Sequence, residues 1–490
     1  MTDQVRVDGG SLTCRRLAAV ARHGAPFDVP ADARERVERS HALADETVAV
    51  RPVYGRTTGV GANRSEAVDA SDTAHGVRLL ASHAAATGPE LSDEVAMATM
   101  LVRLNQLAAG GAGLSPVMFG ALDDSVRRRV IPTIHRGGSI GTGDIAGLAE
   151  LGLMLCGRAP ARSGTPRPVS LTTGDALAFI SSSAMTLADS AFCLLELDRL
   201  LAATEAVNAL SFCATLGSWE SLATEVHEAR PYPAAARCAR EMRELLGLRD
   251  RQTAPAAARL QDPFGWRTFT VVHGCAHDAA AGLQQVVETD INAATENPLV
   301  CLSARDVFHN GNFHLAPLAL AVQYAASALF GTAKLSAARL SDLMEPAQTG
   351  LPSFLAPGPP GSSGLMILEY VVQDALAQMR PALTSFAASS VVVSQGLEDD
   401  SSFAPQAVQA LWRALDPYRT ILSCELVAAA RALQLRGGLP TAAPVGDVFA
   451  HVAKLLPSEL ADRPLGGDVD VARGLLDELP GIAGLQTPTP

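Results

Sequence analysis

The 490-residue sequence has few aromatic residues and almost no lysine. Aromatic side chains make up 4% of it, although apolar residues together reach 48%. The apolar share is therefore mostly Ala, Leu and Val, and because Ala and Leu are strong helix formers, the composition favours a mainly α-helical protein. Lys334 and Lys454 are the only lysines, and no basic stripe accompanies the net charge of −12. Binding to nucleic acid or to an anionic membrane is therefore not expected.

The sequence also lacks the short motifs of common metal and nucleotide sites. It has no His-Glu-x-x-His, EF-hand loop, Walker A motif or dinucleotide-binding Gly-x-Gly-x-x-Gly loop. His273 and His277 are four residues apart on one predicted helix, but no third ligand is evident beside them, so no metal site is predicted. The eight cysteines include no Cys-x-x-Cys pair, and Met1–Gln4 does not resemble the start of a signal peptide. We therefore expect reduced thiols in a cytoplasmic protein.

Long apolar segments occupy much of the second half of the chain. The pattern predicts long helices at 175–216, 271–288, 315–344 and 364–395, which must bury against one another in a bundle. The 315–335 segment is long enough to cross a membrane, but its polar residues favour a buried core helix. We expect three consecutive parts: an N-terminal domain at 1–200, a central long-helix bundle at 201–440, and a C-terminal helical segment with a frayed tail at 441–490.

Two glycine-rich loops carry the candidate chemistry. Gly138–Asp144 precedes an apolar segment with helical spacing, which places Thr142 in a tight loop outside a helix N-terminus. At the junction, the Asp144 carboxylate can accept hydrogen bonds from unpaired N–H groups at the start of the helix. Tyr54 begins the second loop, which contains Gly55, Gly59 and Gly61. A tyrosine there is a candidate acid or base, provided that its pKa of about 10 is lowered.

Several further motifs, taken in order, resemble those of the aromatic amino-acid ammonia-lyase and aminomutase family, which includes histidine and phenylalanine ammonia-lyases. The resemblance extends from about residue 5 to about residue 440. The matching motifs are Tyr54-Gly55, Gly59-Val60-Gly61, Ser82-His83-Ala84, Gln261-Asp262, Thr295-Glu296-Asn297-Pro298-Leu299, Gly311-Asn312-Phe313-His314, Leu351-Pro352-Ser353-Phe354-Leu355, Ser363-Gly364-Leu365-Met366-Ile367 and Glu398-Asp399. Asn105 and Arg267 also fall at family positions.

This resemblance implies a homotetramer of long helices whose active sites are assembled from several subunits. In the family, an Ala-Ser-Gly tripeptide cyclises and loses two waters to form 4-methylideneimidazol-5-one (MIO), an electrophile at helix N-termini. It takes up the substrate amine, and the loop tyrosine removes the β-proton so that ammonia leaves. The resemblance therefore implies catalytic roles for Tyr54, Arg267 and Glu398, and substrate-pocket positions for His83, Asn105, Ser181, Phe264 and Phe313.

The departures from the family pattern are concentrated in this site. Where the family has G-S-x-G-A-S-G-D, this chain has Gly141-Thr142-Gly143 before Asp144, so that Thr replaces the Ser that loses water. A cyclised Thr142 would give an ethylidene group whose extra methyl crowds the reactive carbon. Phe264 and Ser181 replace a Tyr and an Asn. Thr57, Val271 and Asp400 replace the loop Asn, a Gln after Arg267 and a His after Glu-Asp. We therefore expect no cofactor.

Three hypotheses follow for a chain that acts on a small molecule. The preferred one is a biosynthetic enzyme without MIO, in which Tyr54 is the acid or base of an elimination, dehydration or cyclisation of a small carboxylate- or carbonyl-bearing substrate. The first alternative is an ammonia-lyase or aminomutase with an MIO-type group formed from Gly141-Thr142-Gly143. The second alternative is a non-catalytic binding or scaffold protein of the same fold. Tyr54 and Arg267 favour an enzyme, since Arg267 can bind a carboxylate.

Overall fold

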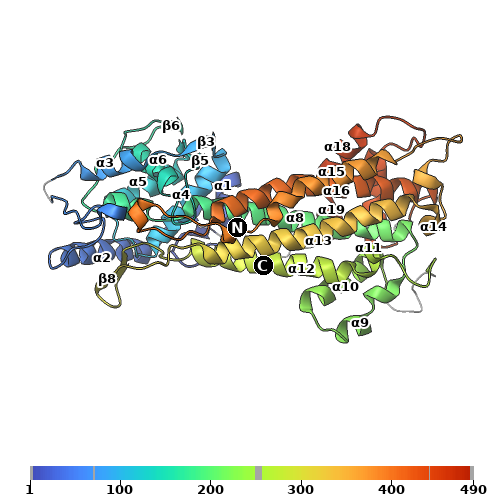
Figure 1. The fold of residues 1–490 in the computed structure, drawn as a ribbon, viewed down its shortest axis with the longest axis horizontal. Coiled ribbons are helices and arrows are strands. Elements are labelled where there is room, and N and C mark those ends of the chain that lie inside the picture. The colour runs from blue at the N-terminus through green and yellow to red at the C-terminus, as the bar shows by residue number, and fades with distance from the viewer. Residues whose placement is uncertain (1–3, 70–71, 249–256, 441, 486–490) are drawn as a thin grey trace. The chain divides into compact units, whose positions relative to one another are not determined.

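The chain is predominantly helical, as the composition predicts (Figure 1). A computed structural model describes residues 4–69, 72–248, 257–440 and 442–485. The tail expected to fray, Thr487 to Pro490, lies outside this part. The strands form short pairs: β1 (Val5–Arg6) with β2 (Phe27–Asp28) in parallel, and β3 (Thr87–Glu90) with β5 (His135–Gly137), β4 (Ile131–Pro132) with β6 (Ala161–Ser163), and β7 (Leu299–Cys301) with β8 (Asp306–Phe308) antiparallel.

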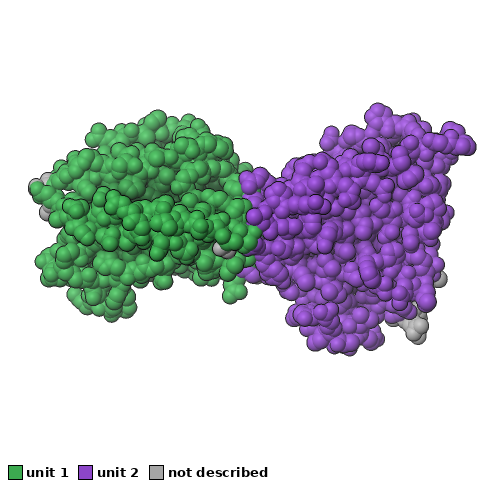
Figure 2. Space-filling view, in the orientation of Figure 1, with its two compact units in different colours: residues 1–195, 283–322, 385–409 green, residues 196–282, 323–384, 410–490 purple. Residues whose placement is uncertain are grey.

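Contacts divide the chain into two compact units, each built from separate stretches of sequence (Figure 2). Unit 1 comprises Met1–Leu195, Leu283–Val322 and Ser385–Gln409, and unit 2 comprises Glu196–Gly282, Gln323–Thr384 and Ala410–Pro490. These units do not coincide with the three consecutive parts expected at 1–200, 201–440 and 441–490. Long helices that contribute to both units bring distant stretches of sequence together, and a division into consecutive segments cannot represent that arrangement.

Shorter helices occupy the first half of unit 1. They are α1 (Cys14–His23), α2 (Ala31–Val48), α3 (His75–His83), α4 (Asp93–Ala108), α5 (Pro116–Arg127), α6 (Ile145–Leu155) and α7 (Asp175–Ile180). Every residue of α4 from Val95 to Ala108 is buried, and α4 packs on α1 and α5. Because α4 is enclosed on all sides, its polar residues must find partners inside the protein.

Four helices longer than 20 residues in the described chain contribute to both units: α8 (Ala184–Ala214), α12 (Phe269–Ile291), α13 (Ala316–Met344) and α16 (Ala404–Leu435). Unit 2 also contains α9 (Thr224–Glu228), α10 (Pro233–Leu246), α11 (Phe264–Arg267), α14 (Pro346–Thr349), α15 (Ile367–Met379), α17 (Pro444–Leu455), α18 (Gly466–Leu475) and α19 (Leu479–Ile482). The bundle of long helices that the sequence predicts is therefore present.

Two of the predicted long helices have different bounds. The 175–216 segment breaks between α7 and α8, where the Ser182 hydroxyl accepts a hydrogen bond from the Ala184 N–H at 3.0 Å and caps α8. The predicted 364–395 helix is restricted to α15, because Pro381 follows it and the chain continues in short 3₁₀ turns. The helix α16 is not among the predicted long helices, and it continues through Pro417.

By length and composition, two helical segments could cross a membrane. The apolar part of Asp175–Ala214 is 94% buried within the chain, which identifies it as core. The corresponding part of Ala316–Met344 is only 44% buried. The sequence therefore overestimated the burial of this helix within one chain, since Leu320 and Tyr324 on α13 are exposed.

Candidate active site

Unit 1 contains a cavity of about 680 Å³ that brings several candidate residues together. Its lining comes from the Tyr54 loop, the Thr142 loop, the segment around β8 and the segment before α16. The described residues that line it are Pro52, Tyr54, Thr58, Arg64, Ser65, Thr142, Ile145, Leu177, Ser181, Asn297, His309, Asn310, Gly311, Phe313, His314, Leu397, Glu398, Asp399 and Asp400. The two glycine-rich loops that the sequence singled out therefore meet at one site.

Tyr54 lies half-buried in this cavity with its hydroxyl fixed by its own loop. The phenolic oxygen accepts a hydrogen bond from the Gly61 N–H at 2.6 Å. Gly61 has a φ of +57°, and a Cβ there would lie 2.5 Å from the Ser394 Oγ, so the close return of the loop requires glycine. The Ser394 Oγ also accepts a hydrogen bond from the Ala62 N–H at 2.8 Å, which joins the loop to the 394–398 segment.

The charge environment of Tyr54 differs from the sequence expectation. Burial raises the pKa of the phenol above its usual value, and the Glu398 carboxylate raises it further. The Gly61 N–H and the Arg64 guanidinium act in the opposite direction but do not outweigh burial. A base at this position requires a lowered pKa, so in the single chain Tyr54 is held in the acid form.

Thr142 lies in a tight loop immediately before α6, as its spacing predicts. Gly141 and Gly143 flank it with φ values of +95° and +116°, in the left-handed region that favours glycine. The Gly141 carbonyl oxygen accepts hydrogen bonds from the Ser402 hydroxyl at 3.1 Å and from the Leu315 N–H at 3.5 Å. A Cβ on Gly141 would lie 2.1 Å from the Ser402 Oγ, so the alanine of the family motif does not fit beside this serine.

Asp144 stabilises a different helix from the one that the sequence suggested. Its carboxylate accepts hydrogen bonds from the N–H and the hydroxyl of Thr186, each at 2.7 Å, in the first turn of α8. It makes no side-chain cap on α6, which begins next to it in the chain. Its N–H donates to the Ser182 carbonyl at 2.7 Å. The Thr142 loop is thus anchored to the start of α8 as well as placed before α6.

A buried ion pair holds part of the cavity lining in position. Arg103 on α4 and Glu296 lie 2.9 Å apart, and both side chains are almost completely buried. Arg103 also donates to the Phe179 carbonyl on α7 at 2.9 Å. The next residue, Asn297, donates its N–H to the Ser181 hydroxyl at 3.2 Å. The ion pair therefore positions the loop that carries Asn297 against Ser181, which replaces the asparagine of the family.

One wall of the cavity is acidic. Glu398, Asp399 and Asp400 are consecutive, and Arg64 is the one Lys or Arg side chain among the described lining residues. The Asp400 carboxylate lies 3.5 Å from the Nε2 of His314. Three carboxylates against one guanidinium give this lining an excess of negative charge, which favours a ligand with a positively charged group.

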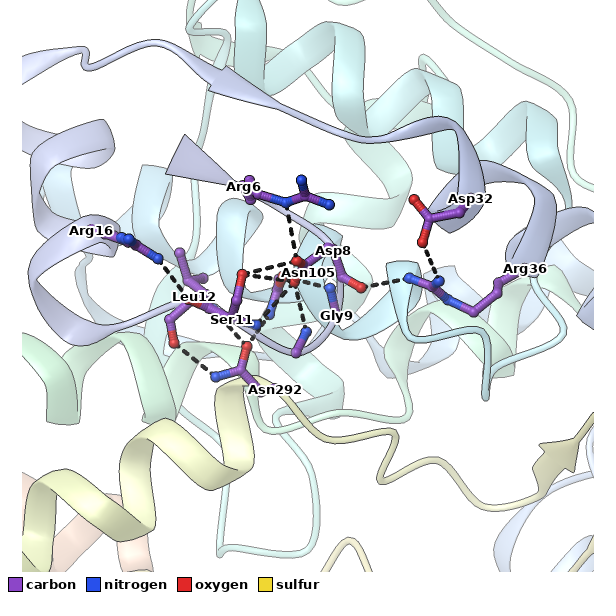
Figure 3. Close-up of polar contacts among 11 residues, drawn as sticks. Arg6, Asp8, Gly9, Ser11, Leu12, Arg16, Asp32, Arg36, Asn105 and Asn292 are labelled. Atoms are coloured by element: carbon purple, nitrogen blue, oxygen red, sulfur yellow. Dashed lines mark hydrogen bonds and ion pairs between the residues drawn. The ribbon is translucent and has the colours of Figure 1, made fainter. Parts of the chain in front are cut away.

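Two of the expected pocket residues in unit 1 are not among the described lining residues. His83 ends α3, and its Nδ1 contacts the Leu79 carbonyl at 2.8 Å. Asn105 is fully buried on α4; its Nδ2 donates to the Ile291 carbonyl at 2.8 Å and to the Asn292 Oδ1 at 2.9 Å (Figure 3). The Asn105 Oδ1 accepts from the Gly9 N–H at 3.0 Å. Within the single chain Asn105 therefore joins an N-terminal turn to the end of α12, and its place in the pocket stays a prediction.

Phe264 and Arg267 belong to unit 2, whereas Tyr54 and the rest of the cavity belong to unit 1. Both residues lie on α11, where the Arg267 guanidinium stands over the Phe264 ring at 4.7 Å. The Arg267 Nη1 donates to the Gln261 Oε1 at 3.0 Å, and Phe264 is 63% exposed. Of the remaining expected residues, Ser181, Phe313 and Glu398 line the cavity with Tyr54.

Comparison with known proteins identifies the family. The family model described as aromatic amino acid lyase matches residues 12–454. The chain belongs to the aromatic amino acid lyase family. Within this family it is 32% identical over 498 residues to a histidine ammonia-lyase of Anaeromyxobacter sp. (strain K), with 96% of this chain and 98% of that protein covered. The mainly helical fold is that of the family, and the chain is a lyase-type enzyme.

Solved structures of family members have the same fold. A crystal structure of the ergothioneine-degrading enzyme ergothionase from Treponema denticola matches with a TM-score of 0.92 at 26% identity, covering 97% of this chain and 99% of that chain. A tyrosine aminomutase from Streptomyces globisporus matches with a TM-score of 0.89 at 26% identity, covering 97% of each chain. Similar folds thus serve enzymes with different names and substrates.

Family membership corrects the expectation that this chain has no cofactor. That expectation rested on the altered residues at 141 and 142, but the chain matches ammonia-lyases over nearly its full length, and the family builds its MIO electrophile at this loop. The local geometry fits such a group. Both flanking glycines adopt positive φ, the Gly141 carbonyl is polarised by two donors, and no described residue accepts a hydrogen bond from the Gly143 N–H.

The structure also identifies cavity residues that sequence reasoning missed. His309 follows β8, and its Nε2 accepts a hydrogen bond from the Tyr54 N–H at 3.2 Å. Asn310 donates to the Glu296 carbonyl at 2.9 Å, while its own N–H donates to the Asn297 Oδ1 at 3.0 Å. The polar run after β8 was a visible signal for Asn310, but nothing in the sequence linked His309 to Tyr54.

Proposed function

We propose that this enzyme removes or relocates the amino group of a small amino acid, with Tyr54 as its acid and base. The observation that carries the proposal is that Tyr54, Thr142 and Glu398, from three distant stretches of sequence, line one cavity. The relatives named histidine ammonia-lyase and tyrosine aminomutase support this reaction class. An elimination and an amino-group migration begin in the same way, so one site can serve either.

The electrostatics of the cavity support a substrate with an ammonium group. Glu398, Asp399 and Asp400 attract a cation, and Arg64 is the one Lys or Arg side chain among the described lining residues. Phe313 and Leu397 supply apolar surface for the remainder of a small side chain. The acidic wall includes Asp400, where the family has a histidine, so we infer that this enzyme selects a more cationic substrate than its relatives.

The proton transfer assigned to Tyr54 is balanced by loss of the amine. In the base form, which the electrostatics of the single chain disfavour, the phenolate oxygen takes a proton from the β-carbon of the substrate. The electron pair of the broken C–H bond forms a double bond between the β- and α-carbons, and the nitrogen leaves the α-carbon with the pair of the C–N bond. The Gly61 N–H stabilises the phenolate. When formed from Gly141-Thr142-Gly143, the family group supplies an electrophile toward the substrate amine.

The complete site requires more than one chain in this proposal. Arg267 and Phe264 lie in unit 2, so their role as carboxylate clamp and pocket wall is proposed for the site of a neighbouring subunit. Exposed apolar side chains on α13 and α15 support a homotetramer, because they suit a subunit interface; they are Leu320, Tyr324, Ile367 and Tyr370. A cytoplasmic location stays a prediction.

Intact mass and product analysis test the proposal together. We expect the purified chain to be lighter than its translated sequence by the mass of two waters. Thr142→Ala has no hydroxyl at this position, so it should not lose the water that comes from the Thr142 side chain. The enzyme is incubated with histidine, tyrosine, phenylalanine and their N-methylated forms. Elimination should release ammonia or the methylated amine together with an unsaturated acid, whereas migration of the amino group should give a β-amino acid. An unmodified mass contradicts the cofactor. A modified, folded chain that converts none of these compounds contradicts the proposed substrate class.

A further inference from the structure

Unit 2 contains a buried cluster of side chains of the types that bind metal ions. In the sequence, these residues are far from those that line the cavity. His273 and His277 lie one turn apart on α12, and Glu205 on α8 faces them. The Glu205 Oε1 is 3.0 Å from the His277 Nε2 and 3.7 Å from the His273 Nε2. All three side chains are at least 96% buried. The spacing of the two histidines was visible in the sequence, and the fold supplies the third ligand that the sequence did not show.

The imidazole of His273 is held with one nitrogen turned toward Glu205. Its ring stacks on Phe269 with centroids 4.7 Å apart and meets the His277 ring edge-on at 4.6 Å. Its Nδ1 lies 3.5 Å from the Thr332 Oγ1. In metal sites the second ring nitrogen of a histidine ligand is usually held by such an outer partner, which fixes the tautomer. The Nε2 of His273 has no hydrogen-bond partner among the described residues, although it is fully buried.

A second carboxylate adjoins the cluster. Glu241 on α10 interacts with Glu205, and its Oε2 is buried with no hydrogen-bond partner in the described chain. Its Oε1 lies 3.4 Å from the Arg237 Nη1. Buried polar atoms are normally hydrogen-bonded, so the unpartnered His273 Nε2 and Glu241 Oε2 in the described chain call for an explanation such as an ion.

We propose that Glu205, His273 and His277 bind a divalent transition-metal ion, with zinc the best match, and that Glu241, which adjoins Glu205, is a candidate for a fourth ligand. Two imidazoles with carboxylates form a common zinc donor set. Zinc bonds of about 2.0–2.1 Å to nitrogen place tetrahedral ligand atoms about 3.3 Å apart, between the two distances observed here. The site joins α8, α10 and α12 inside unit 2 and is structural in character, because its ligands are closed from solvent. It does not depend on the proposed function.

Metal analysis of the full-length enzyme tests the proposal. The chain is produced in zinc-supplemented medium without a metal-affinity tag, and zinc is measured by mass spectrometry after dialysis. We expect about one zinc per chain, and His273→Gln, His277→Gln and Glu205→Gln should each weaken zinc binding by at least about tenfold. His227→Gln is the matched control, because His227 is also buried in unit 2 but contacts the Ser221 carbonyl. It should retain zinc.

A second measurement on the unmodified sequence keeps the test decisive if the variants do not fold. Metal-free enzyme is titrated with CoCl₂, and visible d–d absorption of tetrahedral cobalt, displaced by ZnSO₄, is expected at one ion per chain. X-ray absorption at the zinc edge should show two imidazoles and carboxylate oxygen. A folded chain that gives no cobalt absorption and no bound zinc overturns the proposal. Zinc binding that persists in folded His273→Gln and His277→Gln variants overturns the assignment to this cluster.

Discussion

The hydroxyl of Ser402 donates a hydrogen bond to the carbonyl oxygen of Gly141 across 3.1 Å. Ser402 precedes α16 and Gly141 belongs to the loop before α6, so the contact joins two segments that are distant in sequence. It polarises the carbonyl that would take part in cyclisation, and it also occupies the space of a side chain at position 141. The Ser402 side chain therefore fits only because position 141 is a glycine.

Gly141→Ala should destabilise the enzyme because the new Cβ would lie 2.1 Å from the Ser402 Oγ. Overpacking of this kind costs about 1–3 kcal/mol in unfolding free energy. Urea denaturation of Gly141→Ala and of the double variant Gly141→Ala/Ser402→Gly measures the effect. The double variant should regain part of the loss, and the residual cost comes from the φ of +95°. Equal losses in the two variants would show that the steric contact is unimportant.

Tyr54→Phe should reduce kcat/KM by about 10²–10⁴-fold, the usual contribution of a general acid or base. The hydroxyl bonds only to the loop N–H of Gly61 among the described residues, so the thermal unfolding temperature should change little. Tyr370→Phe is the matched control, because Tyr370 is 67% exposed on α15. Activity of Tyr54→Phe close to that of the control would remove Tyr54 from the mechanism.

Glu398→Gln should move the alkaline rise of kcat/KM to lower pH. The Glu398 charge raises the pKa of Tyr54 because it disfavours the phenolate, so its removal lowers that pKa. The base form of Tyr54 is then populated at a lower pH than in the unmodified enzyme. A pH–rate profile checks the shift, with Glu369→Gln on α15 as the control. A shift to higher pH would contradict the assigned electrostatics.

Arg267→Ala should raise KM more than it lowers kcat if the substrate carboxylate binds Arg267 of another subunit. Light scattering during size-exclusion chromatography must be run alongside, since the effect requires an oligomer. Leu320→Glu, on the exposed face of α13, should favour smaller species and lower the activity per chain. Unchanged steady-state parameters for Arg267→Ala would indicate that its contacts with Phe264 and Gln261 are structural.

Arg103→Met should lower the free energy of unfolding by about 3–5 kcal/mol, because it leaves the buried Glu296 carboxylate without its partner. The pair is 2.9 Å apart, and both side chains are at most 1% exposed. Arg305→Met is the control: its pair with Glu46 is 3.5 Å apart with both side chains largely exposed, and such pairs contribute about 1 kcal/mol at most. Urea denaturation measures both variants, and equal effects would contradict the role of burial.

Sequence reasoning identified the residues whose evidence is local. Thr142 is placed by the glycines around it and by the apolar spacing of α6, and Tyr54 by the glycines of its own loop. It could not show the partners that a residue meets from elsewhere in the chain. Asn105 matched a family position, and the fold shows that its amide is bound by Gly9, Ile291 and Asn292. Likewise, the change at Thr142 suggested a lost cofactor, whereas the match along the chain with ammonia-lyases supports one.

By itself, the sequence determined the helical class, the family motifs and the two glycine-rich loops, because these depend on propensity, spacing and the conformational freedom of glycine. Only the tertiary structure decided which helix Asp144 stabilises, which side chains share the cavity with Tyr54, and that Glu205 faces His273 and His277. Those outcomes depend on how long helices bring distant segments together. The fold then buries residues that are far apart in the sequence beside one another, and their charges interact.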